Sequence, residues 1–189
     1  MAVRKLALTV LCVLLVASAA LAEQSAFSEY QVKAAFLYNF AKFIEWPEKA
    51  LGASNEPIVV AVLGDDPFGE ILDQTLAGKT VGGHPLSVKR FSRSTDLERC
   101  HILFVADSEA GRAAEILARI DASPTLTVGE AARFAERGGM IGFAIEERRV
   151  RFDVNLKAVR AAGLNPSSQL LKVARKVLDL QPSAKADGR

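Results

Sequence analysis

The chain has 189 residues, half of them hydrophobic, with 24 basic residues, 22 acidic residues and a formal net charge of +2. Arg4 and Lys5 lie in a segment that is expected to be removed, which leaves 22 residues of each sign and a neutral mature chain. A neutral chain lacks the clustered basic surface from which nucleic-acid-binding proteins gain affinity, and it lacks a polybasic patch for anionic lipid. The composition therefore argues against nucleic acid and membrane lipid as partners.

Residues 1–22 have the pattern of a cleavable export signal. After the two basic residues, an almost wholly apolar run leads to Ala20-Leu21-Ala22, a small-x-small cleavage pattern. The run has about 15 residues, fewer than the roughly 20 that span a bilayer, and no second apolar run follows. We therefore expect a signal peptide cut after Ala22, a periplasmic mature protein and no insertion into the membrane. An uncleaved N-terminal anchor is the alternative.

The mature chain is expected to form one domain over residues 23–182, because its roughly 170 residues suit a single domain and contain no Pro/Gly/Ser-rich linker. Residues 183–189 are small and polar, and we expect a flexible tail there. Cys12 leaves with the signal, so Cys100 has no partner for an intramolecular disulfide. Cys100 is expected to be a buried thiol at the start of a strand, and a reactive or intermolecular thiol is the alternative.

The first predicted element is a helix over residues 28–46. Ser28 can cap it, and Pro47 disfavours helix at the residue before it. Along this segment an apolar stripe recurs at helical spacing. Its members are Phe36, Leu37, Phe40, Phe43 and Ile44. We expect the stripe to dock in the core, and a face that contacts a ligand or a partner is the alternative.

Two continuous apolar runs, residues 58–63 and 102–106, have the pattern of central strands that are covered on both faces. Between them we predict a helix that starts at Pro67 and ends at Gly78, because proline suits a first helical turn and glycine a helix end. The remaining elements predicted in this part are a strand over residues 86–91 and a short helix over residues 94–99.

The second half of the chain is predicted to contain a β-hairpin. Residues 140–145 and 150–154 alternate apolar and polar side chains, which indicates strands with one covered face and one wet face. The other predicted elements are a helix over residues 109–120 capped by Ser108, a strand over 124–128, a short helix over 130–137, and closing helices over 155–162 and 166–178.

This order of elements predicts an α/β fold. Strands separated by helices of this length pair in parallel through right-handed crossovers, and the hairpin adds an antiparallel pair. We expect a three-layer sandwich with a mixed, mostly parallel sheet of five or six strands, an antiparallel hairpin near the C-terminus and helices on both faces.

No catalytic group of residues can be assembled from the sequence. Gly78-Lys79-Thr80 lacks the first glycine and the preceding strand of a phosphate-binding loop, and the two histidines and one remaining cysteine have no zinc spacing. An enzyme that uses Cys100 and His101 is disfavoured, because adjacent residues of a strand point to opposite faces. We therefore predict a binding protein that is not an enzyme and uses no cofactor or metal.

Carboxylates follow the two buried strands. Asp65 and Asp66 come after the first strand and Asp107 after the second, where open α/β sheets bind ligands. Aspartate is also an ordinary residue at such turns. One candidate function is therefore a periplasmic small-molecule binding protein whose ligand lies at these strand ends.

Six ordered blocks between residues 29 and 174 carry a family resemblance. They are residues 31–47, 62–69, 100–105, 126–129, 138–141, and 151–155 continued by 163–171. These blocks resemble the YfiR-like family of periplasmic regulators. The resemblance implies an α/β fold, a homodimer and a regulator without enzymatic activity. It further implies that the protein binds and represses a membrane-bound signalling protein, first of all an inner-membrane diguanylate cyclase, which lowers cyclic-di-GMP and biofilm formation.

The resemblance also bears on the cysteine. Cys100 matches a cysteine position of the family, but the residue that would pair with it is missing. Redox control through an internal disulfide, which the resemblance would otherwise imply, is therefore not expected, and an intersubunit bridge is the alternative.

The hairpin is the predicted contact with the partner. Its candidate residues are Phe143, Arg149, Arg151 and Phe152. A basic strip beside aromatic residues suits a specific protein interface. For the arginines, the alternative is a solvated strand face without a partner.

Overall fold

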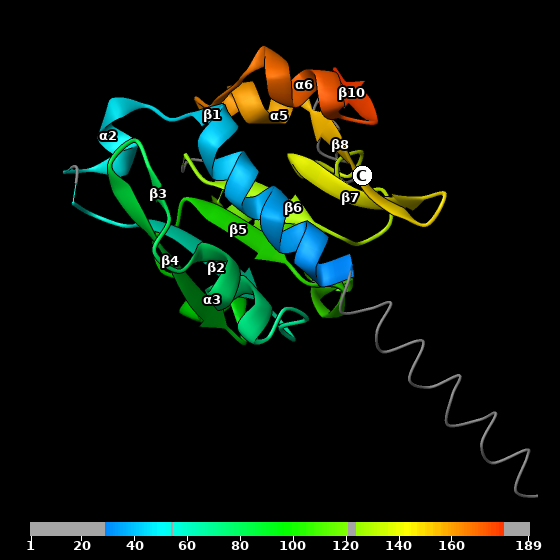
Figure 1. Ribbon diagram of the computed structural model, residues 1–189. Coiled ribbons are helices and arrows are strands. Elements are labelled where there is room, and N and C mark those ends of the chain that lie inside the picture. Colours follow the sequence, from blue (N-terminus) through cyan, green and yellow to red (C-terminus); the bar gives the residue numbers. More distant parts are fainter. Residues whose placement is uncertain (1–28, 54, 121–123, 180–189) are drawn as a thin grey trace, which may run out of the picture.

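The computed structural model describes residues 29–53, 55–120 and 124–179 (Figure 1). The predicted signal peptide, its cleavage site after Ala22 and the predicted tail at residues 183–189 lie outside these ranges, so cleavage of the signal stays a prediction. Within the described ranges, no helix combines the length and the hydropathy of a membrane span.

A mixed sheet of eight strands forms the centre of the described part of the chain, in the order β10-β8-β7-β6-β5-β2-β4-β3. All neighbours are parallel except the pairs β3–β4 and β7–β8. The strands are β2 (Ile58–Leu63), β3 (Thr80–Val81), β4 (His84–Phe91), β5 (Ile102–Val105), β6 (Leu126–Gly129), β7 (Ile141–Glu146), β8 (Arg149–Asn155) and β10 (Lys176–Leu178). The predicted α/β class is confirmed. The sheet exceeds the predicted five or six strands because the short edge strands β3 and β10 have no alternating pattern of their own.

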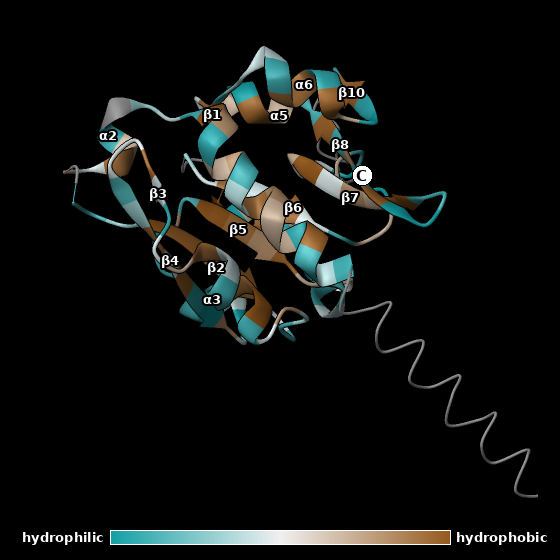
Figure 2. Cartoon of the chain, viewed as in Figure 1, coloured by the Kyte–Doolittle hydropathy of each residue, from teal (hydrophilic) through white to brown (hydrophobic). Residues whose placement is uncertain are grey.

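Different helices cover the two faces of the sheet, as predicted. Val60 and Val62 of β2 belong to the core on one face, whereas Ala61 and Leu63 belong to the core on the other. The first face is covered by the first helix, of which residues 29–43 are described, and by α3 (Glu70–Leu76), α5 (Leu156–Ala161) and α6 (Ser168–Val173). The second face is covered by α4 (Ala113–Ile120) and by turns at residues 131–138. In Figure 2 the central strands are accordingly hydrophobic, while the helices are mixed.

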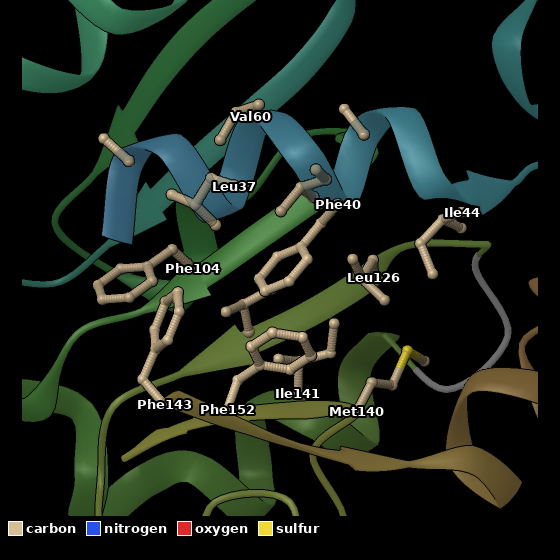
Figure 3. Close-up of a cluster of buried hydrophobic side chains, with 14 of the residues drawn as sticks. Leu37, Phe40, Ile44, Val60, Phe104, Leu126, Met140, Ile141, Phe143 and Phe152 are labelled. Atoms are coloured by element: carbon tan, nitrogen blue, oxygen red, sulfur yellow. The ribbon is translucent and has the colours of Figure 1, made fainter. Parts of the chain in front are cut away.

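The first helix rests on an aromatic cluster (Figure 3). Phe40 is fully buried, and the centroid of its ring lies 5.1 Å from that of Phe152 and 5.9 Å from that of Phe143. Phe36 contacts the same Phe152 ring at 5.2 Å. The predicted apolar stripe therefore docks in the core, and the C-terminal hairpin supplies the rings beneath it.

The first helix ends at residue 43, earlier than predicted. The next two residues form β1 (Ile44–Glu45), which pairs antiparallel with β9 (Asn165–Pro166). The backbone N–H of Ser167 also donates to the carbonyl of Phe43 at 2.8 Å. These contacts with the C-terminal part of the chain take backbone groups that a further helical turn would use. The short helix α2 (Glu48–Leu51) follows.

Two short helices predicted from the sequence are wrong in extent or type. Residues 131–138 form turns rather than a helix, and Arg133 has a φ of 61°, outside the right-handed helical region. Of the helix predicted over residues 94–99, only a 3₁₀ turn, η1 (Ser94–Asp96), is present.

The longer helices at residues 109–120 and 166–178 also differ from the prediction. The first begins as the 3₁₀ helix η2 (Asp107–Arg112) and becomes α-helical only at Ala113. Ser108 does not cap it, because its hydroxyl accepts a hydrogen bond from the N–H of Asp65 instead. The second ends at Val173, and the chain then pairs with β8 as the edge strand β10.

Candidate functional site

The hairpin of β7 and β8 carries the four residues predicted to contact a partner. Phe143 and Phe152 are only 6% and 1% exposed, because they lie on the strand face that the first helix covers. Arg149 and Arg151 are exposed. The expectation that the two aromatic rings form an exposed contact is therefore wrong, whereas the role of the two arginines stays a prediction.

An apolar groove of about 520 Å³ runs beside Arg151, between the first helix, β8 and α6. Val173 on its rim is 56% exposed, which is the highest value among the large exposed hydrophobic residues of the described chain. The residues that line the groove, called here the apolar groove, are Phe36, Asn39, Phe43, Val150, Arg151, Phe152, Gln169, Leu170 and Val173.

The edge of β8 is open beside this groove. On one side, β7 pairs with β8 along residues 149–154. On the other side, β10 pairs only with Asp153, Val154 and Asn155, and the N–H of Arg175 donates to the carbonyl of Phe152 at 2.8 Å. Residues 149–151 therefore have no backbone partner on that side within the described chain. An open edge of this kind can accept an extended segment of another chain.

Three exposed basic residues near the groove, Arg149, Arg151 and Lys172, form no ion pair with any residue that the structure describes. Arg175 differs, because its Nε and its guanidinium NH2 nitrogen donate to the carboxylate of Asp153 at 2.8 and 2.5 Å. These hydrogen bonds raise the pKa of Arg175. The cations near the groove are thus free to pair with a partner, and that of Arg175 is not.

A second cavity, of about 450 Å³, lies at the carboxyl ends of β5, β6 and β7. Its walls come from the first helix, from the turns after β6, from β7 and from the Asp153–Arg175 pair. We call it the charged cleft. Its charged residues are Glu29, Lys33, Asp107, Glu130, Arg133, Glu136, Asp153 and Arg175.

Lys33 is the buried centre of the charged cleft. Its side chain is 4% exposed, and its Nζ lies 2.6 Å from Glu29 Oε1 and 2.7 Å from Glu130 Oε2. Nζ also lies 4.3 Å from the centroid of the Tyr30 ring, whose hydroxyl donates to Glu130 Oε2 at 3.1 Å. Burial alone lowers the pKa of Lys33, but the hydrogen bonds to Glu130 and Glu29 outweigh it and raise that pKa. Lys33 therefore stays charged and ties the first helix to the segment after β6.

The three aspartates at the strand ends do not converge. Asp66 accepts a hydrogen bond from Nε of Arg90 at 2.6 Å. Asp65 is exposed, and its backbone N–H donates to Ser108 Oγ at 2.9 Å. Of the three, Asp107 alone lines the charged cleft. The predicted ligand site at Asp65 and Asp107 is therefore not one cavity.

Side chains fill the space between the ends of β2 and β5. Gly64 has a φ of 96°, and a Cβ there would lie 2.5 Å from Ser108 Oγ and 2.8 Å from Glu109 Cγ. This is the point where the strand order reverses, at which open α/β sheets commonly bind ligands. Among the described residues, no group of three His, Cys, Asp or Glu side chains is placed to hold a metal ion. The available cavity lies instead further along the sheet, at Asp107.

Cys100 is free and 7% exposed, as expected of a structural thiol, and burial raises its pKa to about 12. In the neighbouring His101, Nδ1 accepts from the N–H of Val59 at 2.9 Å and Nε2 donates to the carbonyl of Ala50 at 3.0 Å. Burial lowers the pKa of His101. Both of its ring nitrogens have partners, so His101 does not activate the thiol.

Comparison with known proteins gives one family and two solved structures. The family model described as YfiR/HmsC-like matches residues 30–175. A crystal structure of a conserved domain protein from Vibrio cholerae O1 biovar El Tor is 13% identical with a TM-score of 0.51, over 64% of this chain and 55% of that chain. At this identity, the likeness shows the fold alone.

The second solved structure is the ABC domain in complex with L-Trp from Streptococcus pneumonia. It is 13% identical with a TM-score of 0.49, over 69% of this chain and 57% of that chain. The chain therefore spans just over half the length of each of these two solved chains. No curated protein sequence matches at a significant level.

Proposed function

Since the chain belongs to the YfiR/HmsC-like family, we propose that it is a non-enzymatic regulator that binds and represses a membrane-bound signalling protein. Membership in this family indicates a periplasmic regulator in cyclic-di-GMP signalling. The partner that we propose is therefore the periplasmic portion of an inner-membrane diguanylate cyclase, and repression keeps cyclic-di-GMP and biofilm formation low. We further propose that the signal is cut after Ala22 and that the mature protein is a homodimer.

The observation that carries this proposal is the apolar groove. A cavity of about 520 Å³ with an exposed apolar rim loses unfavourable contact with water when a partner side chain fills it. Arg149, Arg151 and Lys172 form no ion pair within the described part of the chain, and these cations favour a partner segment that carries carboxylates next to its apolar anchor. The two arginines thus keep the contact role predicted from the sequence, while the residues of the groove replace the buried rings.

The open edge of β8 favours an extended segment as the part of the partner that docks. Residues 149–151 offer backbone groups beside the groove. A strand added at this edge would place alternate side chains toward the groove and toward solvent. Main-chain hydrogen bonds would then supply affinity, and the groove would supply specificity.

Repression through such a contact needs no chemical step. A protein that binds only the inactive state of the cyclase shifts the equilibrium of the cyclase toward that state. The size of the shift is set by the difference in affinity for the two states. Release of the regulator would return the cyclase to its active state.

The experiment that tests the proposal is deletion of the gene and complementation with two matched variants. Val173→Glu places a carboxylate on the rim of the groove, whereas Val177→Glu changes another exposed valine, on β10 and outside the groove. We expect cyclic-di-GMP to rise in the deletion strain and to return to normal with the wild type and Val177→Glu, but not with Val173→Glu. Unchanged cyclic-di-GMP on deletion, with no cyclase recovered by the tagged protein from detergent-solubilised membranes, would overturn the cyclase assignment.

A small-molecule binding protein is the second candidate function. It is supported by the charged cleft, which contains Asp107 at the end of β5. The two functions do not conflict, because the cleft and the groove share no residue.

A further inference from the structure

The charged cleft has the size and the position of a ligand site. Its volume of about 450 Å³ falls within the roughly 300–1,000 Å³ of small-molecule sites. Asp107 follows β5 and Glu130 follows β6, so the cleft opens at the carboxyl ends of two parallel strands. Ligands of open α/β sheets are commonly bound at such ends.

The walls of the cleft carry more negative than positive charge. The carboxylates are Glu29, Asp107, Glu130, Glu136 and Asp153, and the cations are Lys33, Arg133 and Arg175. Every one of the three cations already pairs with a carboxylate of the wall. An anionic ligand would have to displace one of these carboxylates, whereas a cationic ligand meets an excess of negative charge. The excess of negative charge in the walls therefore favours a cationic ligand.

Asp107 is the carboxylate that remains for a ligand. It is exposed, and no described residue pairs with its side chain, although its backbone N–H donates to Glu130 Oε1 at 3.3 Å. Ala144 and Ile145 of β7 line the same cleft, and Ile145 is 54% exposed. A carboxylate that no described residue pairs with, in a cavity with the exposed apolar side chain of Ile145, complements an ammonium group on a hydrocarbon body.

The chain itself supplies an example of how the cleft holds an ammonium. Lys33 Nζ lies between the carboxylates of Glu29 and Glu130 and over the ring of Tyr30. Carboxylates and aromatic faces are the groups that bind ammonium ions in proteins. The wall therefore contains the groups that bind ammonium ions, and one of them, Asp107, has no cation beside it among the residues that the structure describes.

We propose that the charged cleft binds a small organic amine, whose ammonium group pairs with Asp107 and whose hydrocarbon part packs on Ile145. This property is separate from the contact with a membrane partner, because no residue of the apolar groove takes part in it.

Isothermal titration calorimetry of the mature chain tests the proposal with three probes: phenethylamine, putrescine and the anion hydrocinnamate, which matches phenethylamine in size. We expect saturable binding of at least one amine and none of hydrocinnamate. Asp107→Asn should weaken amine binding at least fivefold. Asp65→Asn, which removes an exposed strand-end carboxylate outside the cleft, should leave it unchanged.

A second variant keeps the test independent of Asp107. Ile145→Lys replaces the exposed apolar side chain on which the hydrocarbon part packs by a cation and should weaken amine binding at least fivefold. Absence of saturable binding for both amines up to about 10 mM, equal binding of hydrocinnamate, or amine binding that neither Asp107→Asn nor Ile145→Lys reduces would each overturn the proposal. None of these results depends on cyclic-di-GMP, so they leave the proposed repression to its own test.

Discussion

The first helix borders both the apolar groove and the charged cleft, and the two surfaces differ in what they leave unsatisfied. In the cleft, the cations are paired with carboxylates and Lys33 is almost completely buried. In the groove, the apolar side chain of Val173 is exposed and the cation of Arg151 is unpaired in the described chain. One helix thus closes an internal network at its start and offers an open surface further along.

This difference teaches which force would drive binding at each surface. Filling the groove removes apolar surface from water, a gain that salt does not weaken. Binding at the cleft depends on an excess of negative charge at an exposed carboxylate, which salt screens. A ligand of the cleft should therefore lose affinity as the salt concentration rises, whereas the apolar part of a groove contact should keep it.

Phe40→Ala should damage both surfaces and has the largest expected effect. The ring of Phe40 is fully buried and contacts Phe143 and Phe152 beneath the helix. We expect a loss of about 3–5 kcal/mol in the free energy of unfolding, as for other buried phenylalanines. Urea denaturation measures it. Val32→Ala, which truncates a residue of the same helix that is 41% exposed, should change stability by less than about 0.5 kcal/mol. Equal effects of the two variants would contradict a core role for this helix face.

Lys33→Met should damage the cleft and leave the groove intact. It removes the cation that Glu29 and Glu130 share, and we expect the free energy of unfolding to fall by about 2–3 kcal/mol. This loss is at or below the low end of the values for a broken buried ion pair, because Glu29 is partly exposed. Lys42→Met, at an exposed position of the same helix, is the matched control and should cost little. Repression of the partner by the folded Lys33→Met protein should persist, and its loss would contradict the separation of the two surfaces.

The contribution of Lys33 also has a defined pH dependence. Because folding raises its pKa, the stability that it contributes is fully present below the ordinary lysine pKa of 10.5 and is lost as the pH rises through the higher pKa of the folded state. The difference between the wild type and Lys33→Met should therefore be constant near neutral pH and shrink in strong alkali. A difference that grows with rising pH would show that Lys33 is not held as a cation.

Arg151→Glu should damage the groove and leave the cleft intact. The side chain is exposed and unpaired in the described chain, so stability should change by no more than about 0.5 kcal/mol. A like charge facing an acidic partner segment should weaken the contact at least tenfold, which corresponds to about 1.4 kcal/mol. Recovery of the partner from solubilised membranes measures it. Arg137→Glu reverses an exposed charge outside the groove and should have no effect; equal losses in both variants would point to nonspecific electrostatics.

The sequence predicts those parts of the fold that local patterns encode. The strand at residues 58–63 is found at the predicted bounds, because a continuous apolar and mostly β-branched run lies between Pro57 and Gly64. The burial of Lys33 could not be predicted in this way. Helical spacing places Lys33 on the face of the apolar stripe, seven residues before Phe40, but a lysine is buried there only with a partner. That partner, Glu130, is 97 residues away in the chain. Only the tertiary arrangement brings them together.

The candidate site is likewise only partly predictable from local sequence patterns. The alternation of β8 already placed Arg151 and Phe152 on opposite faces of the strand, so one exposed interface could not use both side chains. The groove itself arises where α6 meets the first helix, next to the β1–β9 pair between residues 44–45 and 165–166. No local pattern in either segment encodes the contact between α6 and the first helix, so the groove could not be predicted from the sequence.

Cys100→Ala should affect neither surface and has the smallest expected effect. Cys100 lines neither cavity and is 7% exposed, and its pKa of about 12 leaves almost no thiolate at pH 8. Iodoacetamide should therefore alkylate the native chain at least a hundredfold more slowly than the urea-unfolded chain, as mass spectrometry can measure. On a non-reducing gel, the protein from the periplasm should migrate as a single chain. A Cys100-dependent dimer band would mean that the thiol becomes exposed in the cell. The protein would then have a third, redox-active surface besides the groove and the cleft.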